Sequence, residues 1–143
     1  MQNVLLLLIG VLITASSVMG QTLESDRQIL FDEFPTIRSM RKEKASNDGK
    51  YTDYWFRKGE AQYTRTYYSG ARKMCFHTFS IERAKKRYHL SYSGLEPSFY
   101  TETFSEKENK WVKSKEIDCK VSDLPSQIRF TLEVTQGTLS SYR

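Results

Sequence analysis

The side chains that could perform chemistry are few in this sequence, and their spacing matches no catalytic or metal-binding motif. Only two histidines occur, His77 and His89. With Glu102 they would offer nitrogen and oxygen ligands to a metal ion, but their separations follow no metal-site pattern. Glycine-rich phosphate loops, Gly-x-Ser-x-Gly elbows and His-Glu-x-x-His helices are absent. We therefore predict a protein that is not an enzyme and that uses neither a metal nor another cofactor.

Aromatic side chains favour binding over catalysis. They recur along the expected strands, whereas residues 50–109 contain only two Leu, one Ile and no Val. Aromatic strand faces can line a partly polar cavity for a small amphipathic ligand, or they can fill a dry core when their hydroxyl groups are satisfied. The residues that we expect to line such a cavity are Tyr54, Phe56, Tyr63, Tyr88 and Tyr92.

Alternation along residues 61–68 places Arg65 on the same strand face as Tyr63 and Tyr67. A guanidinium that points inward needs a polar partner or a wet interior, because burying an isolated charge is costly. If that face is buried, the fold must supply Arg65 with one or the other.

The sharpest charge feature is the basic run Arg83, Lys85, Lys86 and Arg87. As an alternative function, this run would bind an anionic polymer or a protein partner at the surface. The composition favours a solvated hairpin loop that protects a sheet edge, and a site of proteolytic maturation is a further alternative. No nucleic-acid-binding motif accompanies it, so we expect no nucleic acid partner.

Residues 1–20 have the composition of a secretory signal peptide. An apolar run that includes Leu5–Leu8 is followed by small residues that end at Gly20. The run is short for a bilayer, which takes about 20 residues to cross, and no second run of that length follows. We predict a secreted, extracellular protein with no membrane span in its mature form, a signal anchor being the alternative.

Export would place Cys75 and Cys119 in an oxidising compartment. An even number of cysteines in an exported chain favours a disulfide bond, and two are too few for a zinc finger. We therefore expect Cys75 and Cys119 to be bonded to each other.

Residues 21–49 are expected to form one short helix and a polar linker. Ser25 and Gln28 fit a capping box, Leu30 and Phe34 share one helix face, and Pro35 ends the helix. The segment from residue 38 to residue 50 is strongly polar and carries no strand pattern, so we assign it to the linker.

Residues 50–136 are expected to form one antiparallel β domain, and residues 137–143 a flexible tail. Aromatic and β-branched runs alternate with turn signals at a regular spacing, which is typical of an antiparallel meander. We predict a mainly β fold of about seven strands, a small barrel or a sandwich, with one short N-terminal helix. The expected strands are Tyr51–Arg57, Ala61–Tyr68, Lys73–Ser80, Arg87–Tyr92, Ser98–Ser105, Lys110–Ile117 and Gln127–Gln136.

This order of signal, helix, meander and disulfide resembles that of small lipocalin-like barrels in architecture alone. Their Gly-x-Trp signature is missing, because Asp53 and Tyr54 precede Trp55. The sequence therefore predicts a secreted, monomeric binding protein. A small amphipathic ligand in a Tyr-lined, barrel-like cavity is the main hypothesis, and an anionic or protein partner on the basic run is the alternative.

Overall fold

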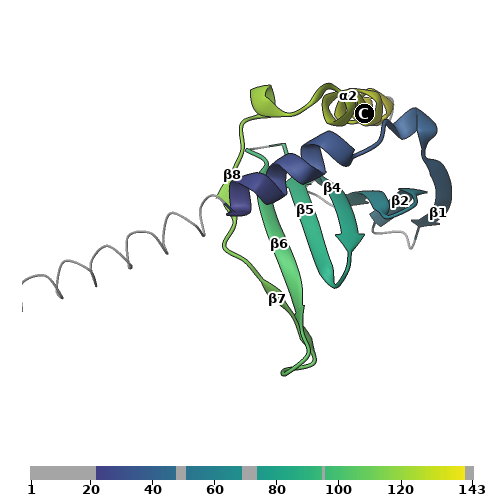
Figure 1. Cartoon of the computed structure of the whole chain (residues 1–143). Helices are drawn as coiled ribbons and strands as arrows, with labels where there is room; N and C mark the ends of the chain where they lie inside the picture. The colour runs from purple at the N-terminus through teal and green to yellow at the C-terminus, as the bar shows by residue number, and fades with distance from the viewer. Residues whose placement is uncertain (1–21, 48–50, 69–73, 95, 141–143) are drawn as a thin grey trace, which may run out of the picture.

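A computed structural model of the chain describes residues 22–47, 51–68, 74–94 and 96–140. These residues form one antiparallel sheet and two helices (Figure 1). The expected signal segment, residues 1–20, and the cleavage site after it lie outside the described residues. Within them, no helix combines the length and the apolar character that crossing a membrane requires.

Seven strands follow one another as a meander, and a short eighth strand pairs with the sixth. The mainly β class and the antiparallel meander are confirmed, and five expected strands between residues 51 and 105 lie close to their expected bounds. The strands are β1 (Arg41–Asn47), β2 (Tyr51–Lys58), β3 (Ala61–Tyr68), β4 (Met74–Arg83), β5 (Lys86–Tyr92), β6 (Ser98–Ser105), β7 (Lys110–Lys113) and β8 (Ile117–Asp118). The helical segments are the N-terminal helix (residues 22–33), the 3-10 turns η1 (Ile37–Ser39) and η2 (Val121–Asp123), and helix α2 (Ser126–Ser140).

Two-residue turns set the register of the central strands. Gly59 begins the β2–β3 turn with a φ of 56°, a left-handed conformation that glycine adopts without a steric penalty. Ala84 and Lys85 form the β4–β5 turn with φ values of 43° and 62°. Two left-handed residues match the twist of a hairpin, although their Cβ atoms make this conformation costly.

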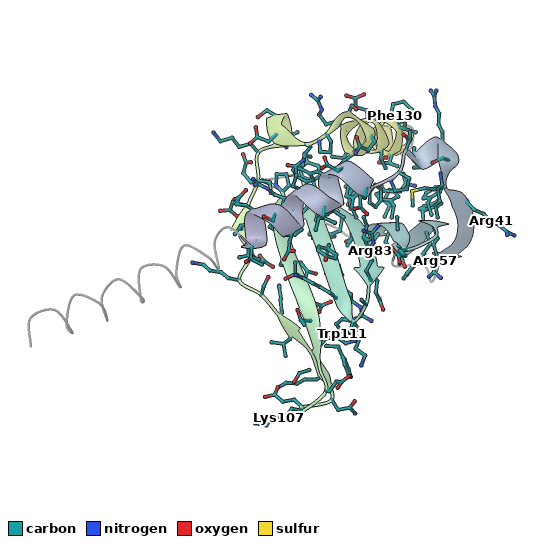
Figure 2. All side chains as sticks on the ribbon, in the orientation of Figure 1. Arg41, Arg57, Arg83, Lys107, Trp111 and Phe130 are labelled. Carbon is teal, nitrogen blue, oxygen red and sulfur yellow. The ribbon has the colours of Figure 1, made fainter. Side chains whose placement is uncertain are left out.

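The inner face of the sheet is covered by both helices. Tyr63, Phe79, Leu90 and Phe99 come from four successive strands and are fully buried. The helices and the η2 segment contribute the aliphatic side chains in which the strands are poor. These are Leu30, Leu124, Ile128 and Leu132. The β6–β7 hairpin, with Lys107 and Trp111, extends beyond this core (Figure 2).

Helix α2 corrects the expectation of a strand at Gln127–Gln136. Ile128 and Leu132 fit a period of two, but their separation of four also fits one face of a helix. The buried residues are Ile128, Thr131, Leu132 and Thr135, which is helical spacing. The hydroxyl groups of Thr131 and Thr135 donate to the carbonyls four residues earlier, at 2.9 and 2.8 Å, which satisfies them inside a helix. The helix continues to Ser140, so residues 137–140 of the expected tail are helical.

Strand β1 corrects the expectation of a linker, since residues Arg41–Asn47 pair with β2. Its sequence is mostly charged and polar, so it lacks the alternation of apolar and polar residues by which a strand is recognised. At a sheet edge, however, backbone hydrogen bonds to one neighbour hold the strand, and charged residues are favoured because they oppose further pairing. A bulge between Lys42 and Lys44 adds one residue to this edge.

The expected barrel or sandwich is wrong, because the sheet remains open between β1 and β7. The two helices cover its inner face and so replace both closure and a second sheet. Without closure, the sheet encloses no barrel interior that could hold a ligand.

The expected disulfide is also not formed, and Cys75 and Cys119 are free cysteines. Cys75 lies on β4, whereas Cys119 directly follows β8, which pairs with the far side of β6. Three strand spacings of about 4.8 Å separate these strands. A disulfide needs Cα atoms within roughly 7 Å of each other, so this strand order keeps the two thiols apart.

Candidate functional site

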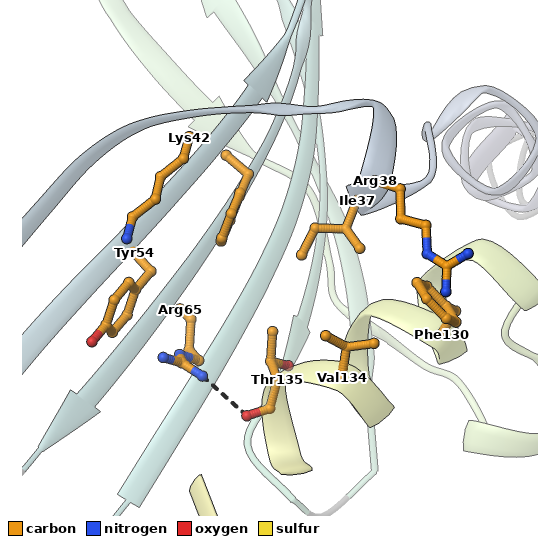
Figure 3. A pocket seen from close by; sticks show the side chains of 9 residues that line it. Ile37, Arg38, Lys42, Tyr54, Arg65, Phe130, Val134 and Thr135 are labelled. Carbon is orange, nitrogen blue, oxygen red and sulfur yellow. Dashed lines mark hydrogen bonds between the residues drawn. The ribbon is translucent and has the colours of Figure 1, made fainter. Parts of the chain in front are cut away.

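A pocket of about 460 Å³ lies where η1, strands β1–β3 and helix α2 meet (Figure 3). Small-molecule sites typically occupy about 300–1,000 Å³, so its size suits a small organic ligand. Residues from η1 and α2 face residues from the sheet across the pocket. The lining consists of Ile37, Arg38, Lys42, Tyr54, Phe56, Arg65, Phe130, Val134 and Thr135.

The pocket has an enclosed floor and an open rim. Arg65 and Thr135 are each 5% exposed and form the floor. Arg38 and Lys42 are exposed, and Val134 is 45% exposed, so these residues form the rim. A ligand that enters between the rim residues would therefore reach Arg65 only after leaving water.

The charge of the lining is entirely positive. Arg38, Lys42 and Arg65 contribute three cations, and none of the nine lining residues is acidic. Aromatic rings hold these cations in place: the Arg65 Cζ and the Lys42 Nζ lie 4.2 and 5.0 Å from the centre of the Tyr54 ring. The Arg38 Cζ lies 4.7 Å from the centre of the Phe130 ring. A concave surface of one sign attracts ligands of the opposite charge.

Arg65 is incompletely satisfied. Its Nη1 donates to the backbone carbonyl of Thr135 at 3.0 Å, which links β3 to α2 (Figure 3). Its Nε is fully buried and has no hydrogen-bond partner. Within the described part of the chain, no carboxylate is paired with Arg65. The sequence analysis required a polar partner or a wet interior for Arg65, and the Thr135 carbonyl meets this requirement only in part. Arg65 still lacks a counter-charge, and a buried guanidinium without one is costly.

A chain of hydrogen bonds beneath the pocket joins β4 to α2 through β3. The Tyr63 hydroxyl donates to Thr135 Oγ1 at 3.2 Å and lies 2.8 Å from His77 Nδ1. Since the only Tyr63 hydroxyl proton goes to Thr135, His77 Nδ1 must carry a proton and donate it to Tyr63. His77 Nε2 is then an acceptor, and it faces the Cys75 thiol at 3.5 Å.

Burial keeps every member of this chain neutral. It raises the pKa of the Tyr63 hydroxyl and of the Cys75 thiol, although the nearby Arg65 acts against both shifts. It also lowers the pKa of His77 to about 4, and Arg65 adds to this effect. A thiol that stays protonated is a poor nucleophile. At neutral pH these groups therefore support the pocket floor and are unsuited to acid–base or nucleophilic catalysis.

The structure brings together only part of the expected ligand-lining set. Tyr54 and Phe56 line the pocket. Tyr63 lies beneath it and is fully buried. Tyr88 and Tyr92 lie on β5, Tyr88 in the core and Tyr92 packed against it. Sequence reasoning missed the lining residues on η1, β1 and α2. The separation of four between residues 130 and 134 was the available signal, and it has meaning only once α2 is known to be helical.

The basic run forms ion pairs within the chain. All four residues contact carboxylates, so the positive charge that the run could present to an anionic partner is largely balanced. The pairs are Arg83 with Glu33 and Glu60, Lys85 with Glu106, Lys86 with Asp26, and Arg87 with Glu82 and Glu102.

The two histidines lie on opposite faces of the sheet. His77 is buried on the inner face, whereas His89 alternates with Tyr88 and Leu90 and therefore lies on the outer face. There its Nε2 is 2.8 Å from Glu102 Oε2. Within the described residues, no group of three His, Cys, Asp or Glu side chains is close enough to hold a metal ion.

Comparisons of this chain with protein-family models, with curated proteins and with solved structures find no match. The function must therefore be inferred from the geometry and charge of the pocket itself.

Proposed function

We propose that this chain is a secreted, non-enzymatic binding protein that holds a small amphipathic ligand between the sheet and helix α2. The observation that carries this proposal is the composition of the pocket. It offers aromatic and aliphatic surface together with three cations and no acid, in a volume of about 460 Å³. Pockets that recognise small molecules combine a mainly apolar lining with a few placed polar groups in this way.

The surroundings of the pocket support binding more than catalysis. Tyr63, Cys75 and His77 form the hydrogen-bond chain beneath the pocket, and burial shifts the pKa of each in the direction that favours its neutral form. General acid–base catalysis works best when the pKa of the group lies near the working pH. None of these three groups meets that condition at neutral pH.

The proposal can be tested with protein secreted from an oxidising eukaryotic host and handled without detergent. Native mass spectrometry should show an added mass that leaves on activation. An anilinonaphthalene sulfonate probe should also bind saturably, with a fluorescence increase. Val134→Trp should fill the pocket from the rim and weaken probe binding at least tenfold. Val121→Trp places the same side chain at an exposed position on η2, outside the pocket, and should leave binding unchanged.

Two results would contradict the proposal. One is a protein that carries no added mass and binds no probe saturably. The other is equal probe binding by the Val134→Trp and Val121→Trp variants, because the probe would then occupy some other surface.

A further inference from the structure

The unsatisfied edge of Arg65 identifies the ligand class more closely. We propose that Arg65 receives the carboxylate of the ligand, and that the pocket therefore selects monocarboxylates with an apolar chain or ring. This inference rests on the proposed function, since it concerns the same pocket. It adds the chemical group that is recognised and the residue that recognises it.

The hydrogen bonding of Arg65 leaves one planar edge of its guanidinium unused. Nη1 is bonded to the Thr135 carbonyl, whereas Nε has no partner. Nε and Nη2 form a fork of two parallel N–H donors, which matches the two oxygens of a carboxylate. An N–H group sealed from water without an acceptor destabilises the protein, and a bound carboxylate would remove that penalty.

The surroundings of Arg65 favour a carboxylate over a phosphate. Arg65 is the single cation at the floor, so one negative charge balances it, whereas a dianion would leave a buried excess charge. The lining also includes the apolar side chains of Ile37 and Phe56, which offer no hydrogen-bond donors to the further oxygens of a phosphate. Buried oxygens without hydrogen-bond donors are costly.

The remaining lining describes the rest of the ligand. Ile37, Phe56 and Phe130, together with Val134 at the rim, supply the apolar surface of the pocket. A water molecule occupies roughly 30 Å³, so the pocket corresponds to about 15 waters and suits a ligand with a similar number of non-hydrogen atoms. Arg38 at the exposed rim would speed the approach of an anion, and salt would screen this contribution.

The test compares acids with alcohols of the same shape. Isothermal titration calorimetry on the secreted protein would use decanoate against decanol and 1-naphthoate against 1-naphthol. In at least one pair, we expect the acid to bind about tenfold or more tightly than the alcohol, because charge-assisted hydrogen bonds to a buried arginine are strong. Decyl phosphate should bind more weakly than decanoate.

Variants at two positions separate the floor from the rim. Arg65→Met should lose the preference for the acid but still bind the alcohol, which also shows that the variant is folded. Arg65→Lys keeps the charge without the fork and should lose most of the preference. Arg38→Gln, the matched rim control, should weaken acid binding only about two- to threefold, and this difference should vanish at high salt.

Three outcomes would overturn the inference while the proposed function stands: equal affinity for acid and alcohol in both pairs, decyl phosphate binding as tightly as decanoate, or an Arg65→Met variant that still prefers the acid. If no member of either pair binds and the naphthalene sulfonate probe also fails, the proposed function is wrong, and the inference fails with it.

Discussion

Lowering the pH from 7 to 5 should destabilise this protein by about 2 kcal/mol through His77. The pKa of His77 is about 4 in the folded protein, against 6.5 for an unperturbed histidine, and burial is the main cause. Between about pH 4 and pH 6.5, the unfolded chain binds a proton on His77 that the folded protein does not. The stabilisation is therefore complete above pH 6.5 and is lost as the pH falls toward 4. At about 1.4 kcal/mol per pKa unit, the full loss is about 3 kcal/mol.

The hydrogen-bond chain gives the structural reason. Protonation would place a second N–H on His77 Nε2, which faces the Cys75 thiol 3.5 Å away and accepts the thiol proton in the neutral state. It would also add a positive charge near the buried Arg65, which itself lowers the pKa of His77. Both changes oppose protonation inside the folded protein.

Urea unfolding at pH 5, 6 and 7 would measure the effect in the wild type and in two variants. His77→Gln should lose most of the pH dependence. His89→Gln should lose less, because the hydrogen bond from His89 to Glu102 offsets part of the lowering of the His89 pKa by burial. An NMR titration should find the His77 ring half-protonated near pH 4. The reasoning is refuted if His77→Gln retains the wild-type pH dependence, or if the His77 resonance titrates near pH 6.5.

Three further predictions concern stability. Ile128→Ala should lower the free energy of unfolding by about 2–4 kcal/mol, because Ile128 is fully buried, whereas Val134→Ala should cost less than about 0.5 kcal/mol. Equal losses in urea denaturation would contradict a helix at α2, since both residues would share one face of a strand. Lys86→Ala should lower the free energy of unfolding by about 2 kcal/mol because it leaves the buried carboxylate of Asp26 unpaired. Lys85→Ala removes an exposed ion pair with Glu106 and should leave the free energy of unfolding almost unchanged. Similar shifts of the thermal unfolding midpoint in the two variants would count against this ranking. Ala84→Asn should stabilise the β4–β5 turn by about 0.5–1 kcal/mol, since asparagine tolerates a left-handed conformation, and an unchanged unfolding midpoint would show that this turn is unstrained.

The predictable part of the fold depended on local signals. The β2–β3 hairpin follows from alternating aromatic residues on either side of Gly59, and its strands end within one residue of the predicted bounds. Turn residues and alternation act over a few neighbouring positions, so they remain visible without tertiary information. The N-terminal helix was also expected and ends before Pro35, but residues 22–25 are already helical, so Ser25 lies inside the helix and is not the predicted cap.

The parts that were missed depend on neighbours in space. Ile128 and Leu132 are four residues apart, which suits a strand and a helix equally, and the uncovered face of the sheet decides between them. The charged strand β1 exists because β2 offers it backbone hydrogen bonds. Neither partner can be recognised from the segment itself.

By itself, the sequence determined the meander, the β2–β3 hairpin and the unusual position of Arg65 on an inward-facing strand face. The tertiary structure decided what surrounds Arg65: a carbonyl of α2 on one side, the Tyr54 ring on another and no paired carboxylate among the described residues. It also decided that the basic run is paired with acids from distant segments and that the two cysteines stay apart. The physical reason is one of range. Periodicity and turn chemistry are properties of adjacent residues, whereas burial, charge compensation and pocket shape arise only when separate segments pack together.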